Sequence, residues 1–200
     1  LGASALASGS LSGNYNIAVG TYALGSNTSG AYNTAVGDYS TNSNTTGTNN
    51  SSFGQASLYN NSTGSYNVAV GVSALNSNTT ASNNTAVGYQ AGYSNTTGTQ
   101  NAFFGQVAGY NSTSDNNTLI GRAAGYGVTS GGGNTHVGSS AGSGASGTGN
   151  NNTSIGYLSA ASLTSGASNT AVGYQSLGSN TTASNNTAVG YQAGYSNVTG

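Results

Sequence analysis

The chain has 200 residues, of which 34% are hydrophobic and 2% are charged, and its formal net charge is -1. With a single Arg and no Lys it has no basic surface for nucleic acid or anionic membranes, and with no Cys it has no disulfides or thiolate metal sites. No apolar run approaches the roughly 18 residues of a membrane span, so we expect no membrane insertion in this segment.

A phrase like "NTAVG" recurs along the chain, and the glycine that ends it serves as an anchor. From Gly20 onward the anchors are 17 residues apart, except for one step of 16 and one of 18. The anchor glycines are Gly2, Gly20, Gly37, Gly54, Gly71, Gly88, Gly105, Gly121, Gly138, Gly156, Gly173 and Gly190. Such a period, with a short β-branched stretch bounded by Asn and Gly, is typical of a β-solenoid.

We therefore expect an all-β fold, a parallel β-roll or β-helix of about twelve 17-residue coils, with residues 1–200 forming a single repeat array. At roughly 4.8 Å per strand, the rod would be about 55 Å long. The chain starts at Leu and stops in mid-phrase, so we expect it to be a window of a longer polypeptide. Residues 126–150 are rich in Gly and Ser and are flanked by both irregular steps, which indicates either a looser coil or a hinge.

Within each coil, the first expected feature is an Asn four residues before the anchor. We call these residues the asparagine column, and we expect their amides to form a ladder from coil to coil, as in stacked sheets. The column comprises Asn16, Asn33, Asn50, Asn67, Asn84, Asn101, Asn117, Asn134, Asn152, Asn169 and Asn186.

The strand comes next, and a bulky apolar residue stands directly before each anchor. We call these residues the valine column and expect them to form the core, with the Thr two residues earlier on the same face. The column comprises Val19, Val36, Phe53, Val70, Val87, Phe104, Ile120, Val137, Ile155, Val172 and Val189. The residue between them, which is Phe103 or Leu119 in some coils, is expected to face outward or toward a partner chain. After the anchor, whose Gly permits a turn, an invariant Ala or Ser indicates a second wall that passes close to the first.

The outer turn carries regularly placed N-x-S/T sequons. These are candidate N-glycosylation sites on one edge of the rod, although "SNTTG" is also good turn chemistry. The candidate asparagines are Asn27, Asn44, Asn61, Asn78, Asn95, Asn111, Asn180 and Asn197. The Thr residues that follow, such as Thr28, Thr45 and Thr79, suggest an ice-binding ladder as a further alternative.

Tyr and the few ionisable residues offer weaker patterns. Tyr59, Tyr93, Tyr110, Tyr126 and Tyr195 share one column and would either pack between coils or chains, or bind a ligand. Catalysis needs converging acid, base or nucleophile pairs. Asp38, Asp115, Arg122 and His136 instead fall in different columns of different coils, so we expect no enzyme, no cofactor and no metal site.

The core "N-T-A-V-G-x-x-A", for example residues 84–91, resembles the "NSVAIG"-like head repeats of trimeric autotransporter adhesins. It is also similar to "NTAVGYQA" repeats of phage tail-fibre-like and bacterial surface fibre proteins. This resemblance, which covers essentially the whole chain, implies a left-handed β-roll, three chains side by side and a role in adhesion. The period here is longer than in the adhesin heads.

Taken together, these features predict an extracellular structural protein: a self-assembling fibre or surface-appendage shaft, with itself as partner and covalent glycans as candidate decoration. The alternative is an adhesin head or a receptor-binding segment of a phage tail fibre. Specific binding should then appear at a coil that departs from the uniform pattern.

Overall fold

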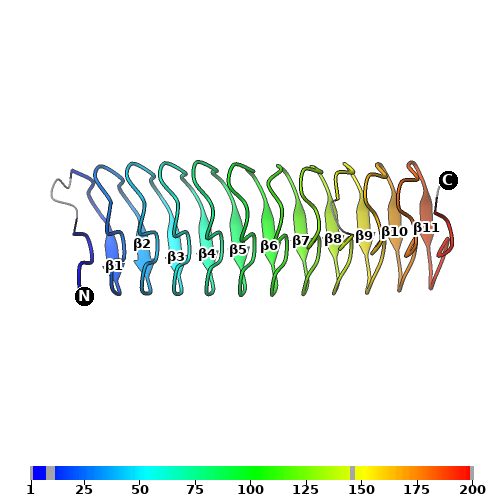
Figure 1. Cartoon of the computed structure of the whole chain (residues 1–200), viewed down its shortest axis with the longest axis horizontal. Coiled ribbons are helices and arrows are strands. Elements are labelled where there is room, and N and C mark those ends of the chain that lie inside the picture. Colours follow the sequence, from blue (N-terminus) through cyan, green and yellow to red (C-terminus); the bar gives the residue numbers. More distant parts are fainter. Residues whose placement is uncertain (1, 8–11, 145–146, 199–200) are drawn as a thin grey trace.

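The computed structural model describes residues 2–7, 12–144 and 147–198, and over them the chain forms a rod of stacked coils (Figure 1). The expected all-β solenoid with parallel strands is confirmed. Its eleven strands are β1 (Ile17–Val19), β2 (Thr34–Val36), β3 (Ser51–Phe53), β4 (Val68–Val70), β5 (Thr85–Val87), β6 (Ala102–Phe104), β7 (Thr118–Ile120), β8 (Thr135–Val137), β9 (Thr153–Ile155), β10 (Thr170–Val172) and β11 (Thr187–Val189).

All eleven strands form one parallel sheet in sequence order. Equivalent residues of successive strands are paired, such as Val19 with Val36 and Val70 with Val87. Pairing stays in register across both irregular steps, where Phe103 lies opposite Leu119 and His136 opposite Ser154. The missing and the extra residue are therefore absorbed outside the strands. Side chains consequently stack in straight columns along the rod.

The valine column lies at the surface, contrary to the sequence-based expectation. The middle residue of each strand is buried and both flanking residues are partly or fully exposed; Phe103 is 0% exposed, for example, whereas Phe104 is 39% exposed. The expected core residues that instead face outward are Val19, Val36, Phe53, Val70, Val87, Phe104, Ile120, Val137, Ile155, Val172 and Val189.

The narrow interior of the coil explains why the middle residue of each strand, and not the valine column, points inward. The second wall sends Leu24, Leu58, Leu75 and Leu177 into the same space, and all four are essentially fully buried. Little room is left for the strand, so its inward residue is Ala or Ser in most coils. A bulky or β-branched residue in every strand would overpack a core of this width.

Where the strand supplies a large inward residue, the second wall supplies glycine. A Cβ added to Gly109 would lie 2.5 Å from the ring of Phe103, and one added to Gly92 would lie 2.5 Å from the same ring and 2.9 Å from Leu75. Gly125 stands in the same relation to Leu119, and Gly142 to His136. Core volume is thus conserved by exchange between the two walls.

The asparagine column joins each coil to the next through its side chains. The Oδ1 of Asn50 accepts the backbone N–H of Asn67 at 3.0 Å, while its Nδ2 donates to the carbonyl of Gly64 at 2.8 Å. The first of these bonds recurs at every step from Asn16 to Asn186. The ladder therefore runs mainly from side chain to backbone, with direct amide–amide bonds added at some steps, such as Asn101 to Asn84.

The anchor glycines cannot be replaced without strain. Gly88 has a φ of 135°, and a Cβ there would lie 2.6 Å from the carbonyl oxygen of Gly105 in the next coil. Both the backbone conformation and the close approach therefore require glycine.

Candidate functional site

The four ionisable side chains with catalytic chemistry do not converge. Asp38 and Asp115 are exposed, and their Oδ1 atoms accept the backbone N–H groups of Thr21 and Thr99 at 2.7 and 2.6 Å. Arg122 is exposed after β7, several coils from Asp38. Within the part of the chain that the structure describes, no three His, Asp or Glu side chains gather where they could hold a metal ion.

His136 is the only ionisable group of the core among the described residues. It occupies the inward position of β8 and is 2% exposed, and its Nδ1 has no hydrogen-bond partner. Burial lowers the pKa of this imidazole to about 4, against a smaller opposing effect of the Thr135 backbone. It is therefore a neutral core residue at physiological pH, where it replaces the Ala of other coils.

Six of the eight candidate glycosylation sites point into the rod, so the expectation that they lie on an outer edge is wrong for them. Asn27, Asn44, Asn61, Asn78, Asn95 and Asn180 are each 0% exposed. The Nδ2 atom that would carry a glycan is bonded inside, as from Asn44 to Asn27 Oδ1 at 2.7 Å and from Asn95 to the Gly98 carbonyl at 2.9 Å. Only Asn111 and Asn197 are partly exposed.

Four of these buried asparagines, Asn27, Asn44, Asn61 and Asn78, form a second internal amide ladder. Asn44, Asn61 and Asn78 each donate to the Asn of the preceding coil. Buried Val128 and Leu163 take the corresponding place in two other coils. Those apolar replacements are the signal in the sequence that could have placed this column inside.

The hydroxyls proposed for an ice-binding ladder are engaged within the rod. Thr28, Thr45 and Thr79 donate through Oγ1 to the backbone carbonyl one coil further on, at 2.8, 3.0 and 3.1 Å. They point along the axis and hold neighbouring turns together.

The outer face of the sheet is the most regular exposed surface. It combines the valine column with the residues two positions earlier, which are Thr in most strands, and it holds no charged side chain in any strand. Val19, Ile120 and Ile155 are 46%, 40% and 40% exposed. An apolar row that continues over every coil is untypical of a monomer surface and typical of an interaction surface.

Tyrosines stack on one another in short ladders. Tyr93, Tyr110 and Tyr126 have ring centroids 5.1 and 5.3 Å apart, and Tyr22 and Tyr39 lie 5.3 Å apart. Further ladders join Tyr15 with Tyr32, and Tyr157 with Tyr174 and Tyr191. Within a ladder each ring covers the face of its neighbour, so only the ends present an open ring face. Tyr59, which shares a sequence column with Tyr93, Tyr110 and Tyr126, packs against Tyr39 instead.

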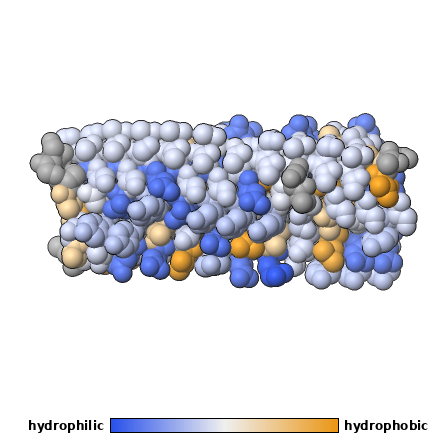
Figure 2. Space-filling model, in the orientation of Figure 1, coloured by the Kyte–Doolittle hydropathy of each residue, from blue (hydrophilic) through white to orange (hydrophobic). Residues whose placement is uncertain are grey.

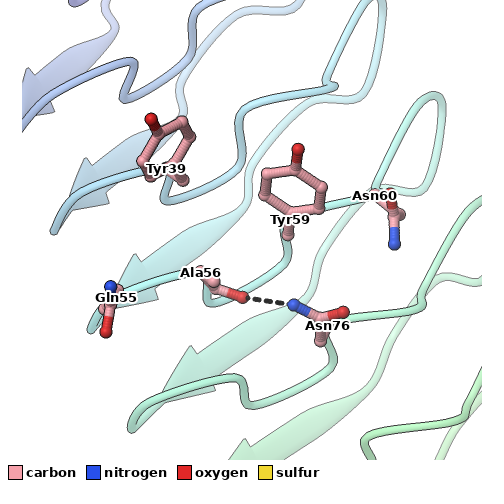
Figure 3. Close-up of a pocket in the computed structure, with 6 residues that line it drawn as sticks. All are labelled: Tyr39, Gln55, Ala56, Tyr59, Asn60 and Asn76. Carbon is pink, nitrogen blue, oxygen red and sulfur yellow. Dashed lines mark hydrogen bonds between the residues drawn. The ribbon is translucent and has the colours of Figure 1, made fainter.

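Two depressions in the part of the chain that the structure describes stand out from the otherwise uniform coils. One, of about 340 Å³, is lined by Tyr39, Gln55, Ala56, Tyr59, Asn60 and Asn76 (Figure 3). The other, of about 530 Å³, lies where Gly132 and Gly133 lack side chains, between Asp115–Asn116 and Asn150–Asn151. On the face shown in Figure 2, the remaining surface is mostly pale or hydrophilic, with isolated hydrophobic spots.

No family model, curated protein or solved structure matches this chain. Among the described residues, no helix has the length and apolar character to cross a membrane.

Proposed function

We propose that the chain is a structural segment: the shaft of an extracellular fibre or surface appendage that associates with copies of itself. The observation that carries this proposal is the single uninterrupted sheet of eleven in-register strands. In such an array each coil contacts only its neighbours, so adding coils adds length without altering the local structure. The four ionisable candidates lie apart, which supports a mechanical role over catalysis.

The outer sheet face is the surface that we assign to self-association. It carries the valine column along the whole rod and no charge, so two copies can approach without like-charge repulsion. Burying this column would remove from water the apolar area that the single rod leaves exposed, which stabilises by roughly 25 cal/mol per Å². Two copies also share the same coil spacing, so contacts repeat at every strand.

Analytical ultracentrifugation of the chain over a range of concentrations, with electron microscopy of the same samples, tests this function. We expect side-by-side assemblies of rods. Replacing Val70 and Ile155 by Lys should shift the protein toward single rods, because two charges then enter the contact. The same pair of substitutions at exposed Thr46 and Thr97, on a different edge, should leave association unchanged. A wild-type chain that remains monomeric at all concentrations would contradict the proposal.

A receptor-binding segment of an adhesin or tail fibre is the second candidate. The observation that favours it is the pair of depressions, since a uniform shaft needs neither.

A further inference from the structure

Ala56 ends the tyrosine ladder formed by Tyr22 and Tyr39. The three residues occupy the same position in successive coils and share the same left-handed backbone, with φ of 56°, 58° and 54°. A Tyr at residue 56 would therefore continue the ladder. Because Ala stands there, no parallel ring continues the ladder beyond Tyr39. The tilted ring of Tyr59 contacts Tyr39 from the next coil instead, and Tyr39 is 40% exposed.

A second ring, tilted and not stacked, borders the space that Ala56 leaves. Tyr59, from the same coil as Ala56, has its ring centroid 6.3 Å from that of Tyr39 and is tilted by 57°. Figure 3 shows the two rings on either side of the depression, with both hydroxyls toward the same side and Ala56 below. The depression of about 340 Å³ lies near the lower end of the range for small-molecule sites, roughly 300–1,000 Å³.

Carboxamides supply the polar part of the lining. Asn76 donates through Nδ2 to the carbonyl of Ala56 at 3.1 Å and so fixes the floor (Figure 3). Among the described residues, the Gln55 and Asn60 side chains have no hydrogen-bond partner. A carboxamide both donates and accepts, as a sugar hydroxyl does.

The lining contains no charge. The nearest carboxylate along the chain, Asp38, accepts the N–H of Thr21 in the preceding coil, and the single Arg lies several coils away. An anionic ligand would find no counter-charge in this depression. A neutral ligand with one apolar face and several hydroxyls fits it best.

We infer that this depression binds one pyranose unit of a neutral glycan. The ring centroids of Tyr39 and Tyr59 are 6.3 Å apart, too close for a sugar to lie between them. The C–H face of the sugar therefore packs across the exposed parts of both rings, and its hydroxyls bond to the carboxamide of Gln55 or of Asn60. This site goes beyond the structural role and does not depend on it, because a shaft can form whether or not the depression is occupied.

The test uses the whole chain and four named probes: the methyl glycosides of glucose, galactose, mannose and N-acetylglucosamine. Saturation-transfer NMR should detect weak binding of at least one, and spectra of the protein should show shifts of the Tyr39 and Tyr59 ring signals on its addition. Ala56→Tyr should weaken that binding about tenfold or more, since the new ring fills the depression that Ala56 lines. Its backbone conformation is already that of Tyr22 and Tyr39, so the fold should persist.

Ala123→Tyr is the matched control, because Ala123 holds the same coil position with a φ of 55° four coils away. It should leave binding unchanged, and Tyr39→Leu should abolish the ring shifts. The inference is overturned if none of the four glycosides binds, or if Ala56→Tyr binds as the wild type does. It is equally overturned if Ala123→Tyr weakens binding as much as Ala56→Tyr. Rod formation is read separately by electron microscopy, so loss of glycan binding alone would not touch the proposed shaft.

Discussion

Phe103 and Phe104 are neighbours in the sequence with opposite environments. The Phe103 ring is fully buried between Gly92, Gly109 and the side chains of Leu75 and Leu119, whereas Phe104 is 39% exposed on the outer sheet face. Substitutions at these two positions therefore test core packing and surface association separately within one strand.

Replacing Phe103 by Ala should lower the free energy of unfolding by about 3–5 kcal/mol, because both walls around it carry glycine and cannot refill the cavity. Phe104→Ala is the control, and it should cost less than about 1 kcal/mol in the single rod. Denaturant unfolding under dilute conditions measures both values. A larger loss for Phe104→Ala than for Phe103→Ala would show that the strand faces the other way.

His136 makes the stability of the rod dependent on pH. Its pKa is lowered from 6.5 to about 4 by burial, so below about pH 6.5 the unfolded chain binds the proton more readily than the folded chain. The contribution of the neutral His136 imidazole to the free energy of unfolding is therefore complete above pH 6.5 and is lost as the pH falls toward 4.

We expect the free energy of unfolding to be about 2–3 kcal/mol lower at about pH 4.5 than at about pH 7.5 because of this residue. His136→Leu should remove that difference, since Leu119 occupies the same inward position in the preceding coil. Urea unfolding of both proteins at the two pH values gives the comparison. A leucine variant that keeps the full pH dependence would assign it to other groups.

At the scale of the structural elements, each Asn of the asparagine column contributes more to the stability of the rod than an ordinary turn residue would. Asn84 accepts the backbone N–H of Asn101 at 3.0 Å and donates to the carbonyl of Gly98 at 2.8 Å. The Gly98 carbonyl has a second donor, Asn95, so the Asn101 N–H is the group that depends on Asn84.

Asn84→Ala should therefore cost about 1–3 kcal/mol, the penalty of one unsatisfied buried donor. Hydrogen exchange at the Asn101 amide should quicken at the same time. The neighbouring exposed Asn83 has a φ of 62°, and Asn83→Gly should change neither quantity appreciably. Slow exchange at Asn101 in the Ala variant would mean that another acceptor takes over.

At the scale of the whole molecule, stability and length should change in units of one coil. Removing residues 38–88 joins the anchor Gly37 directly to Tyr89, the residue after the anchor Gly88. The deletion therefore removes three periods of 17 residues. We expect a folded rod that is shorter by roughly 14 Å. Removing residues 38–81 instead leaves the columns out of register and should give a loss of β-structure. Small-angle scattering and circular dichroism measure these outcomes, and a folded, shortened rod from both deletions would contradict the column model.

The period, the parallel stacking and the position of the asparagine column could be read from the sequence because in-register stacking repeats each side chain at a constant spacing. The same repetition cannot tell the inside from the outside. A three-residue strand has two phases, and a shift of one residue exchanges the faces. Hydrophobicity alone therefore favoured the wrong face for the valine column.

The tertiary structure decided the phase, because the second wall already fills the interior with Leu24, Leu58, Leu75 and Leu177. It likewise turned the sequon asparagines inward, where bonds within the coil and between coils satisfy their amides. The compensation between Phe103 and Gly109 was present in the sequence, yet its meaning required knowing that the two side chains share one cavity. The spacing of residues along the chain determined that it forms a rod. Contacts between the two walls of each coil determined which side chains the rod exposes.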